Sequence, residues 1–155
     1  MACLGTPPEG YHSITPHLVL KDANAAIQFY KNAFGAEEIS RIPYKQGDSR
    51  LMHAQIRIGD SMVMLADEFP EMDCYGPRQT GATPITLHLY VENVDAVMDR
   101  AALFGAQIVM PAQDMFWGDR YGRLVDPFGH SWSVATQLYS DRSQIPKELA
   151  VSRCS

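Results

Sequence analysis

Features that mark several well-known protein classes are scarce or missing in this 155-residue chain. Its three cysteines, Cys3, Cys74 and Cys154, are too few and too widely spaced for a disulfide framework or a CxxC metal pair. No apolar run approaches the roughly 18 residues of a membrane-spanning helix. The N-terminal residues contain no basic segment followed by an apolar one, so no signal peptide is predicted. The sequence therefore favours a cytoplasmic protein.

An excess of positive charge is also missing. The chain has 13 Lys and Arg against 18 Asp and Glu, which gives a net charge of −5. Because nucleic acids and anionic membranes repel an acidic protein, neither is expected as a partner. An apolar content of 46% and this length suit one globular domain, or two half-size units that share a core.

What the chain does contain is an internal repeat. Residues 14–20 (ITPHLVL) return as residues 85–91 (ITLHLYV), and the offset between His17 and His88 is 88 − 17 = 71. A Phe-Gly-Ala triplet and a Gly-x-Ser motif recur 70 positions apart. Both copies alternate in polarity, so each is predicted to be a strand with Thr and His on one face.

The same order of elements follows each copy. In the first half, Asp22 is the predicted N-cap of a helix that ends at Gly35. A strand at 36–43 and a hairpin of strands 51–58 and 61–66 are predicted after this helix. In the second half, the corresponding predictions are a helix at 94–104, a strand at 107–110 and a hairpin of strands 121–126 and 130–136. The fold class is therefore predicted as α+β, with two strand–helix–three-strand modules.

This pattern divides the chain into five segments. They are an N-terminal tail (1–13), module 1 (14–68), a linker rich in Pro and Gly (69–83), module 2 (84–137) and a C-terminal extension (138–155). The two modules together are expected to form one domain.

Four stretches carry a resemblance to a known family. They are residues 26–38 (AIQFYKNAFGAEE), 52–61 (MHAQIRIGDS), 65–71 (LADEFPE) and 116–122 (FWGDRYG). With its paired modules, the chain resembles the vicinal oxygen chelate superfamily, the glyoxalase, bleomycin-resistance and extradiol-dioxygenase group, and in particular its PhnB-like branch. The resemblance implies paired βαβββ modules, an open eight-stranded barrel-like sheet with a cavity, and a homodimer. It implies no single reaction, because the superfamily contains isomerases, dioxygenases, thiol transferases and metal-free drug-binding proteins.

The positions that hold the metal in metal-dependent members carry unsuitable residues here. The resemblance places them at Thr15 and Thr86 on the first strands, at Ser133 on a last strand and, through the offset of 70, at Val63. Divalent metals in such sites are usually held by His, Gln or Glu. A standard metal centre is therefore not expected.

A second set of polar residues is displaced along the same strands. His17 and His88 lie two residues beyond the threonines, and Asp67 and Gln137 lie four beyond the last-strand positions, with Glu68 nearby. Residues at even spacing share a strand face, so these side chains could meet at one end of the cavity. Three interpretations stay open: a divalent metal bound chiefly by His17, Asp67 and His88, hydrogen-bonded histidines in a pocket or core, and a general base or ligand anchor.

The segment 114–122 combines aromatic and charged residues. Trp117 and Tyr121 could stack on a planar ligand while Arg120 pairs with a carboxylate or phosphonate. Alternatively, Asp119 and Arg120 form a local ion pair and Trp117 fills the core.

The sequence favours a protein that binds a small organic ligand between the modules without a standard metal centre. The candidate pocket residues are Thr15, His17, Asp67, Glu68, Thr86, His88, Trp117, Arg120, Tyr121, Ser133 and Gln137. The first alternative is a metal-dependent lyase, isomerase or dioxygenase-like enzyme that uses His17, Asp67, His88 and Gln137. The second is an architectural or regulatory dimer with a vestigial cavity. No catalytic residue, cofactor or substrate is assigned.

Overall fold

The computed structural model describes residues 5–147. The chain divides into two compact units between Gly81 and Ala82, inside the stretch predicted as the linker. Cys3, Cys154 and the end of the predicted C-terminal extension lie outside the described residues. No helix within residues 5–147 is long and apolar enough to cross a membrane.

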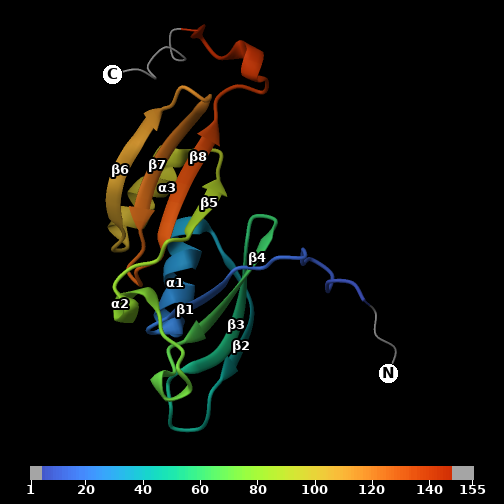
Figure 1. The fold of residues 1–155 in the computed structure, drawn as a ribbon, viewed down its shortest axis with the longest axis vertical. Coiled ribbons are helices and arrows are strands. Elements are labelled where there is room, and N and C mark those ends of the chain that lie inside the picture. Colours follow the sequence, from blue (N-terminus) through green and yellow to red (C-terminus); the bar gives the residue numbers. More distant parts are fainter. Residues whose placement is uncertain (1–4, 148–155) are drawn as a thin grey trace. The chain divides into compact units, whose positions relative to one another are not determined.

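The first unit is a four-stranded sheet with one main helix (Figure 1). Its elements are β1 (His17–Leu20), α1 (Ala23–Phe34), β2 (Glu37–Pro43), β3 (Leu51–Ile58) and β4 (Ser61–Asp67), followed by η1 (Pro70–Met72) and the one-turn helix α2 (Pro77–Thr80). The strand order is β1-β4-β3-β2, with β1 parallel to β4 and the other pairs antiparallel.

The second unit repeats this architecture. It consists of β5 (Thr86–Tyr90), α3 (Val94–Leu103), β6 (Gln107–Asp114), β7 (Asp119–Val125) and β8 (Ser131–Gln137), followed by η2 (Arg142–Gln144). The order is β5-β8-β7-β6, again with the outer strand β5 parallel to β8. The α+β class and the repeated βαβββ order are therefore confirmed. The eight strands form two four-stranded sheets rather than one continuous sheet.

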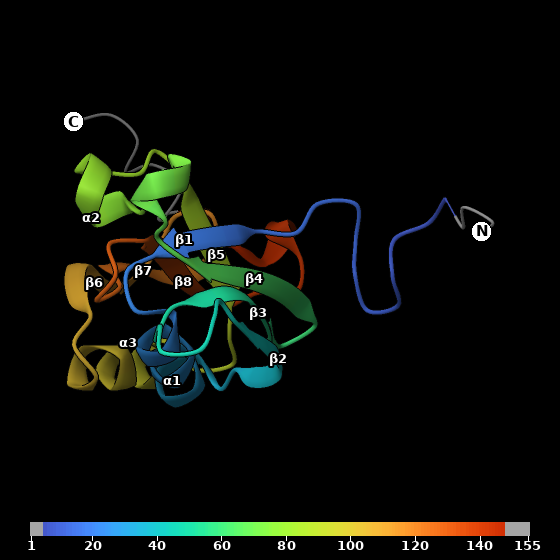
Figure 2. The same ribbon diagram turned by 90° about the horizontal axis from the view of Figure 1, so that it is seen from below.

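Helix α1 shows why the sequence folds this way locally. The Asp22 carboxylate accepts a hydrogen bond from the Ala25 backbone N–H at 3.0 Å, and Gly35 ends the helix in the left-handed region with φ 68°. Both caps are as predicted. The apolar stripe of the helix is buried and consists of Ala26, Ile27, Tyr30, Ala33 and Phe34. Figure 2 shows α1 under the sheet of its own unit, along β3 and β4.

Each sheet has one face against its helix and one face turned away, here called the far face. In the first unit, Leu20, Ile56 and Leu65 lie on the helix face and are buried. Because neighbours on a strand alternate, the residues between them lie on the far face. The candidate site residues separate according to this alternation.

Some element bounds differ from the prediction. Strand β1 begins at His17, so Thr15 precedes it. Strand β6 continues to Asp114 and β7 starts at Asp119, which shortens the predicted aromatic loop to a four-residue turn, 115–118. Residues of that motif therefore follow strand geometry from Asp119 onward.

Candidate functional site

The register of the sheets decides which residues of the two units correspond. His17 lies opposite Met64 on the neighbouring strand, and His88 lies opposite Ser133. The counterpart of Ser133 is thus Met64, at an offset of 133 − 64 = 69, and not Val63 as predicted from the offset of 70. Val63 lies on the helix face and is buried. A shift of one residue moves a side chain to the opposite face, because the side-chain period of a strand is two.

Asp67 belongs to the helix face and not to the predicted pocket. Its Oδ1 accepts hydrogen bonds from the backbone N–H groups of Asp22 and Ala23 at 2.8 and 3.0 Å, and its Oδ2 accepts one from Leu51 N–H at 2.7 Å. The residue is buried. Its counterpart at the same offset, 136 − 67 = 69, is Thr136, whose hydroxyl oxygen accepts from Val94 N–H at 2.8 Å. Both side chains therefore hold the start of a helix.

Arg120 also lies on the helix face. Its Nε donates to one carboxylate oxygen of Asp95 on α3 at 2.7 Å, and its Nη1 donates to Asp114 on β6 at 2.9 Å. The hydrogen bond from Arg120 is the main cause that lowers the pKa of Asp95. The ion pair predicted as one alternative, between Arg120 and Asp119, is replaced by pairs with Asp95 and Asp114. Arg120 instead links a helix to two strands.

The remaining candidates of the first unit are spread over its surface. Glu68 accepts a hydrogen bond from the Gly76 N–H at 2.9 Å and thus holds the linker against the sheet. Thr15 lines a cavity of about 450 Å³ with Tyr11 and other residues before β1. His17 lies on the far face, where its ring centroid is 5.5 Å from that of His53. Burial, and secondarily the charge of His53, lower the pKa of His17.

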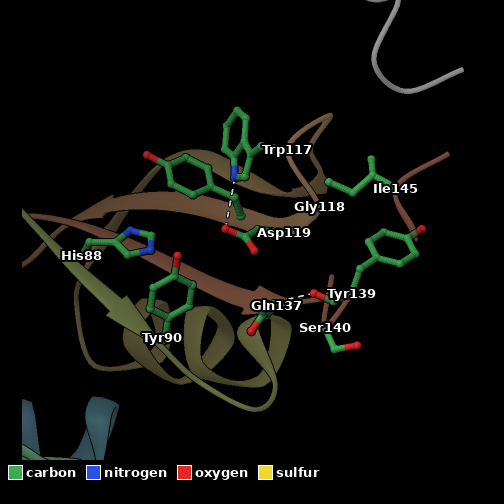
Figure 3. A pocket seen from close by; sticks show the side chains of 10 residues that line it. His88, Tyr90, Trp117, Gly118, Asp119, Gln137, Tyr139, Ser140 and Ile145 are labelled. Atoms are coloured by element: carbon green, nitrogen blue, oxygen red, sulfur yellow. Dashed lines mark hydrogen bonds between the residues drawn. The ribbon is translucent and has the colours of Figure 1, made fainter. Parts of the chain in front are cut away.

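The second unit does bring several predicted residues together. His88, Trp117, Tyr121 and Gln137 line one pocket of about 680 Å³ on the far face of the sheet (Figure 3). Its other lining residues are Tyr90, Gly118, Asp119, Tyr139, Ser140 and Ile145. Thr86 lies on the same face of β5 but does not line the pocket.

Aromatic rings form one side of the pocket wall, beside the polar side chains of Asp119, Gln137 and Ser140. The ring of His88 is 4.5 Å from that of Tyr90, nearly perpendicular to it, and 6.0 Å from that of Tyr121, nearly parallel to it. The ring of Trp117 is 5.4 Å from that of Tyr121 at an angle of 80°. Edge-to-face and offset-stacked pairs at these distances are mutually attractive. The rings therefore form a continuous aromatic surface.

Hydrogen bonds fix the polar groups of the pocket. Ser133 is buried beneath His88, and its hydroxyl oxygen lies 2.6 Å from His88 Nδ1. The indole N–H of Trp117 donates to Asp119 Oδ2 at 3.1 Å, and the Gln137 side-chain amide donates to the Tyr139 carbonyl oxygen at 2.8 Å. Figure 3 shows the last two of these bonds as dashed lines. These bonds fix the orientations of His88, Trp117 and Gln137.

Gly118 allows the chain to close around the pocket. Its backbone has φ 98°, a conformation that residues other than glycine rarely adopt. A Cβ atom added there would lie 2.9 Å from Ile145 Cδ1. Position 118 therefore requires glycine both for its backbone conformation and for lack of space for a side chain.

The comparisons with known proteins agree with this architecture. The family model of the glyoxalase/bleomycin resistance protein/dioxygenase superfamily matches residues 11–134. The chain belongs to this superfamily. An uncharacterized protein of Mycobacterium bovis is 48% identical over 126 residues, which cover 79% of this chain and 81% of that protein. YjdN of Escherichia coli is 25% identical over 140 residues, which cover 78% of this chain and 92% of that protein.

Solved structures of this superfamily have the same fold. TioX from Micromonospora sp. ML1 matches with a TM-score of 0.63 and 28% identity, over 81% of this chain and 98% of that one. The PhnB protein of Bacillus cereus, described as a putative 3-demethylubiquinone-9 3-methyltransferase, matches with a TM-score of 0.65 and 22% identity, over 81% and 99%. At that identity the second likeness concerns the fold alone.

The metal-ligand set predicted from the sequence does not fit this member of the superfamily. Asp67, its one carboxylate ligand, uses both oxygens to accept backbone hydrogen bonds on the helix face, away from His17. Among residues 5–147, no three His, Cys, Asp or Glu side chains come close enough to share a metal ion. No step of a metal-assisted reaction is derived from this donor set.

Six of the ten described lining residues are not among the pocket residues predicted from the sequence. Tyr90 lies two residues after His88 on the same strand face, so the alternation of β5 could have identified it. Tyr139, Ser140 and Ile145 belong to the predicted C-terminal extension, which has no periodic pattern. Only the structure shows that this segment returns to the sheet.

Proposed function

We propose that this member of the superfamily binds a small, planar organic molecule in the aromatic pocket of its second unit. The observation that carries the proposal is the arrangement of His88, Tyr90, Trp117 and Tyr121 around one cavity of about 680 Å³. Ligand pockets of proteins typically have volumes of about 300–1,000 Å³, with aromatic side chains and a few polar groups that orient the ligand.

The exposure of these rings supports binding over a purely structural role. Trp117 is 36% exposed and Tyr90 is 64% exposed, although both side chains are large and apolar. A planar ligand would cover these faces and remove apolar surface from water, at about 25 cal/mol per Å². Hydrogen bonds within the protein hold His88, Trp117 and Gln137, so these three side chains lose little conformational entropy on binding.

A thermal-shift screen of planar organic compounds, followed by calorimetry, tests the proposal. A compound that raises the melting temperature should bind Trp117→Ala and Tyr121→Ala about fivefold more weakly, because each ring contact contributes on the order of 1 kcal/mol. The matched control is Tyr44→Ala in the first unit, whose ring packs on Phe69 at 4.9 Å. That variant should keep the affinity. Unchanged affinity in both pocket variants would contradict the proposal.

One observation favours a second candidate, general acid–base catalysis by His88. Ser133 holds the imidazole through Nδ1, so the plane of the ring is fixed, and the ring lies at the wall of the pocket (Figure 3). When Nδ1 is protonated and donates a hydrogen bond to the Ser133 hydroxyl oxygen, Nε2 is unprotonated and can act as a base.

This candidate predicts proton exchange at an activated carbon. An α-hydroxyketone incubated in deuterated water should exchange its α-proton faster with the protein than without it, and His88→Gln should abolish the acceleration. Equal exchange in the wild type and in His88→Gln, measured by proton NMR, rules out the base and leaves the binding proposal intact.

Homodimerisation in the cytoplasm is also part of the proposal. Ile42 of the edge strand β2 and Met52 of the neighbouring strand β3 are 51% and 42% exposed, and contact with a second copy would cover this apolar surface. Sedimentation velocity should give about twice the mass of 17.3 kDa for the wild type. Ile42→Lys should shift the protein towards the monomer, and a monomeric wild type would contradict this part.

A further inference from the structure

We propose that the pocket of the second unit selects organic cations: compact aromatic amines or quaternary ammonium compounds. This inference rests on the proposed function and adds the chemical class of the ligand. It is carried by the pairing of a carboxylate with two aromatic rings in a pocket whose described lining residues include neither Lys nor Arg.

The charges that line the pocket have one sign. Among the described lining residues, Asp119 carries a carboxylate, and there is no Lys or Arg. Arg120, the next residue, lies on the opposite face, where it pairs with Asp95 and Asp114. Arg123 lies further along β7 opposite Ser133 and is not part of the lining. Within the described lining, an anionic ligand would therefore meet the Asp119 carboxylate and no Lys or Arg side chain.

The rings provide the second element of a cation site. The faces of Trp and Tyr carry negative electrostatic potential and attract ammonium groups within about 6 Å of the ring centre. Trp117 and Tyr121 meet at 5.4 Å and 80°, so two ring surfaces enclose a corner rather than a flat wall. Such corners are typical of the cages that bind quaternary ammonium groups.

Asp119 connects the two elements. Its Oδ2 accepts the indole N–H of Trp117 at 3.1 Å, which holds the carboxylate beside the ring. Within the described residues, Oδ1 has no hydrogen-bond partner. A cationic ligand can therefore contact the ring faces and Oδ1 at the same time, with Asp119 as the residue that determines charge preference.

A matched set of three probes tests this preference by calorimetry. They are 3-hydroxyphenyltrimethylammonium, its neutral isostere 3-tert-butylphenol, and 3-hydroxybenzoate. We expect the cation to bind at least tenfold more tightly than the neutral isostere, and the benzoate to bind most weakly. In Asp119→Asn the cation should lose at least fivefold in affinity while the neutral isostere changes less than twofold. Asp99→Asn, an exposed position on α3, removes the same charge elsewhere and should change neither.

The outcomes separate this inference from the proposed function. Equal or tighter binding of the neutral or anionic probe, with sensitivity to Trp117→Ala, overturns cation selectivity and leaves the planar-ligand proposal standing. If Asp119→Asn and Asp99→Asn reduce the preference for the cation equally, the preference comes from the net charge of the protein. That result also overturns the inference. Failure of all three probes to bind contradicts both proposals.

Discussion

At the scale of the residue, two adjacent side chains have different roles because a strand alternates. Asp119 lies in the aromatic pocket, and Arg120 lies on the helix side in an ion pair with Asp95. The sequence shows both as charged residues in one motif. To assign them to opposite faces, one must know that β7 begins at Asp119. The aromatic residues and glycines around this position do not show in the sequence where the strand begins.

The carboxylate of Asp67 should be required for stability rather than for ligand or metal binding. Asp67→Ala leaves three backbone N–H groups without their acceptor, at a cost of about 3 kcal/mol in the free energy of unfolding. Asp67→Asn keeps one acceptor oxygen and should lose about half as much. Urea denaturation followed by circular dichroism measures both. A wild-type transition midpoint in Asp67→Ala would refute the capping role.

The hydroxyl of Ser133 should contribute to affinity by holding His88. Ser133→Ala removes the hydrogen bond of 2.6 Å and frees the imidazole, so the affinity for a pocket ligand should fall about threefold to tenfold. Ser131→Ala, two residues earlier on the same face of β8, is the matched control and should bind as the wild type does. Calorimetry distinguishes the two. Equal affinities in both variants would show that His88 needs no anchor.

At the scale of the element, most of the fold could be predicted from the sequence. The caps and the buried stripe of α1 follow from residue types at helical spacing, and β3 was predicted with its observed bounds. The register between the halves could not be predicted in the same way. The turn from Ile58 to Ser61 is shorter than the turn from Val125 to Ser131, so a single offset cannot align all strands. That difference misplaced Val63 and Asp67.

The contact between α3 and the sheet should depend on pH through Asp95. Arg120 lowers the pKa of this carboxyl in the folded protein, so the folded state favours the ionised form. The stabilisation is present above the ordinary pKa of Asp, about 3.9, and is lost as the pH falls through the lower folded value. Asp95→Asn should therefore melt at a lower temperature than the wild type at about pH 7, and at the same temperature at about pH 2.

Two comparisons make this test specific. High salt should reduce the difference at neutral pH, because the ion pair is exposed to solvent. Asp99→Asn, which removes a carboxylate one turn further along the same helix that forms no ion pair with Arg120 within the described residues, is the matched control. A difference between Asp95→Asn and the wild type that persists at acid pH would mean that helix packing, and not the ion pair, is responsible.

At the scale of the whole molecule, one architecture carries two different far faces. The histidine of the repeat is present in both units, but Ser133 beneath His88 corresponds to Met64 opposite His17. The first unit also lacks a counterpart of the Trp-Gly-Asp turn, since residues 44–50 contain one aromatic residue, Tyr44. The repeat predicted the fold of both units, whereas the chemistry of the pocket depends on residues that differ between the units.

Single-tryptophan fluorescence tests the central claim, an aromatic ligand pocket in the second unit, most directly. Trp117 lines the pocket, whereas Trp132 is buried on the helix face and donates to Asp126 Oδ2 at 2.9 Å. Titration with a compound that raises the melting temperature should change the emission of Trp132→Phe, in which Trp117 remains, in a saturable way. The emission of Trp117→Phe should stay constant over the same titration. A saturable change in Trp117→Phe together with none in Trp132→Phe would contradict the account.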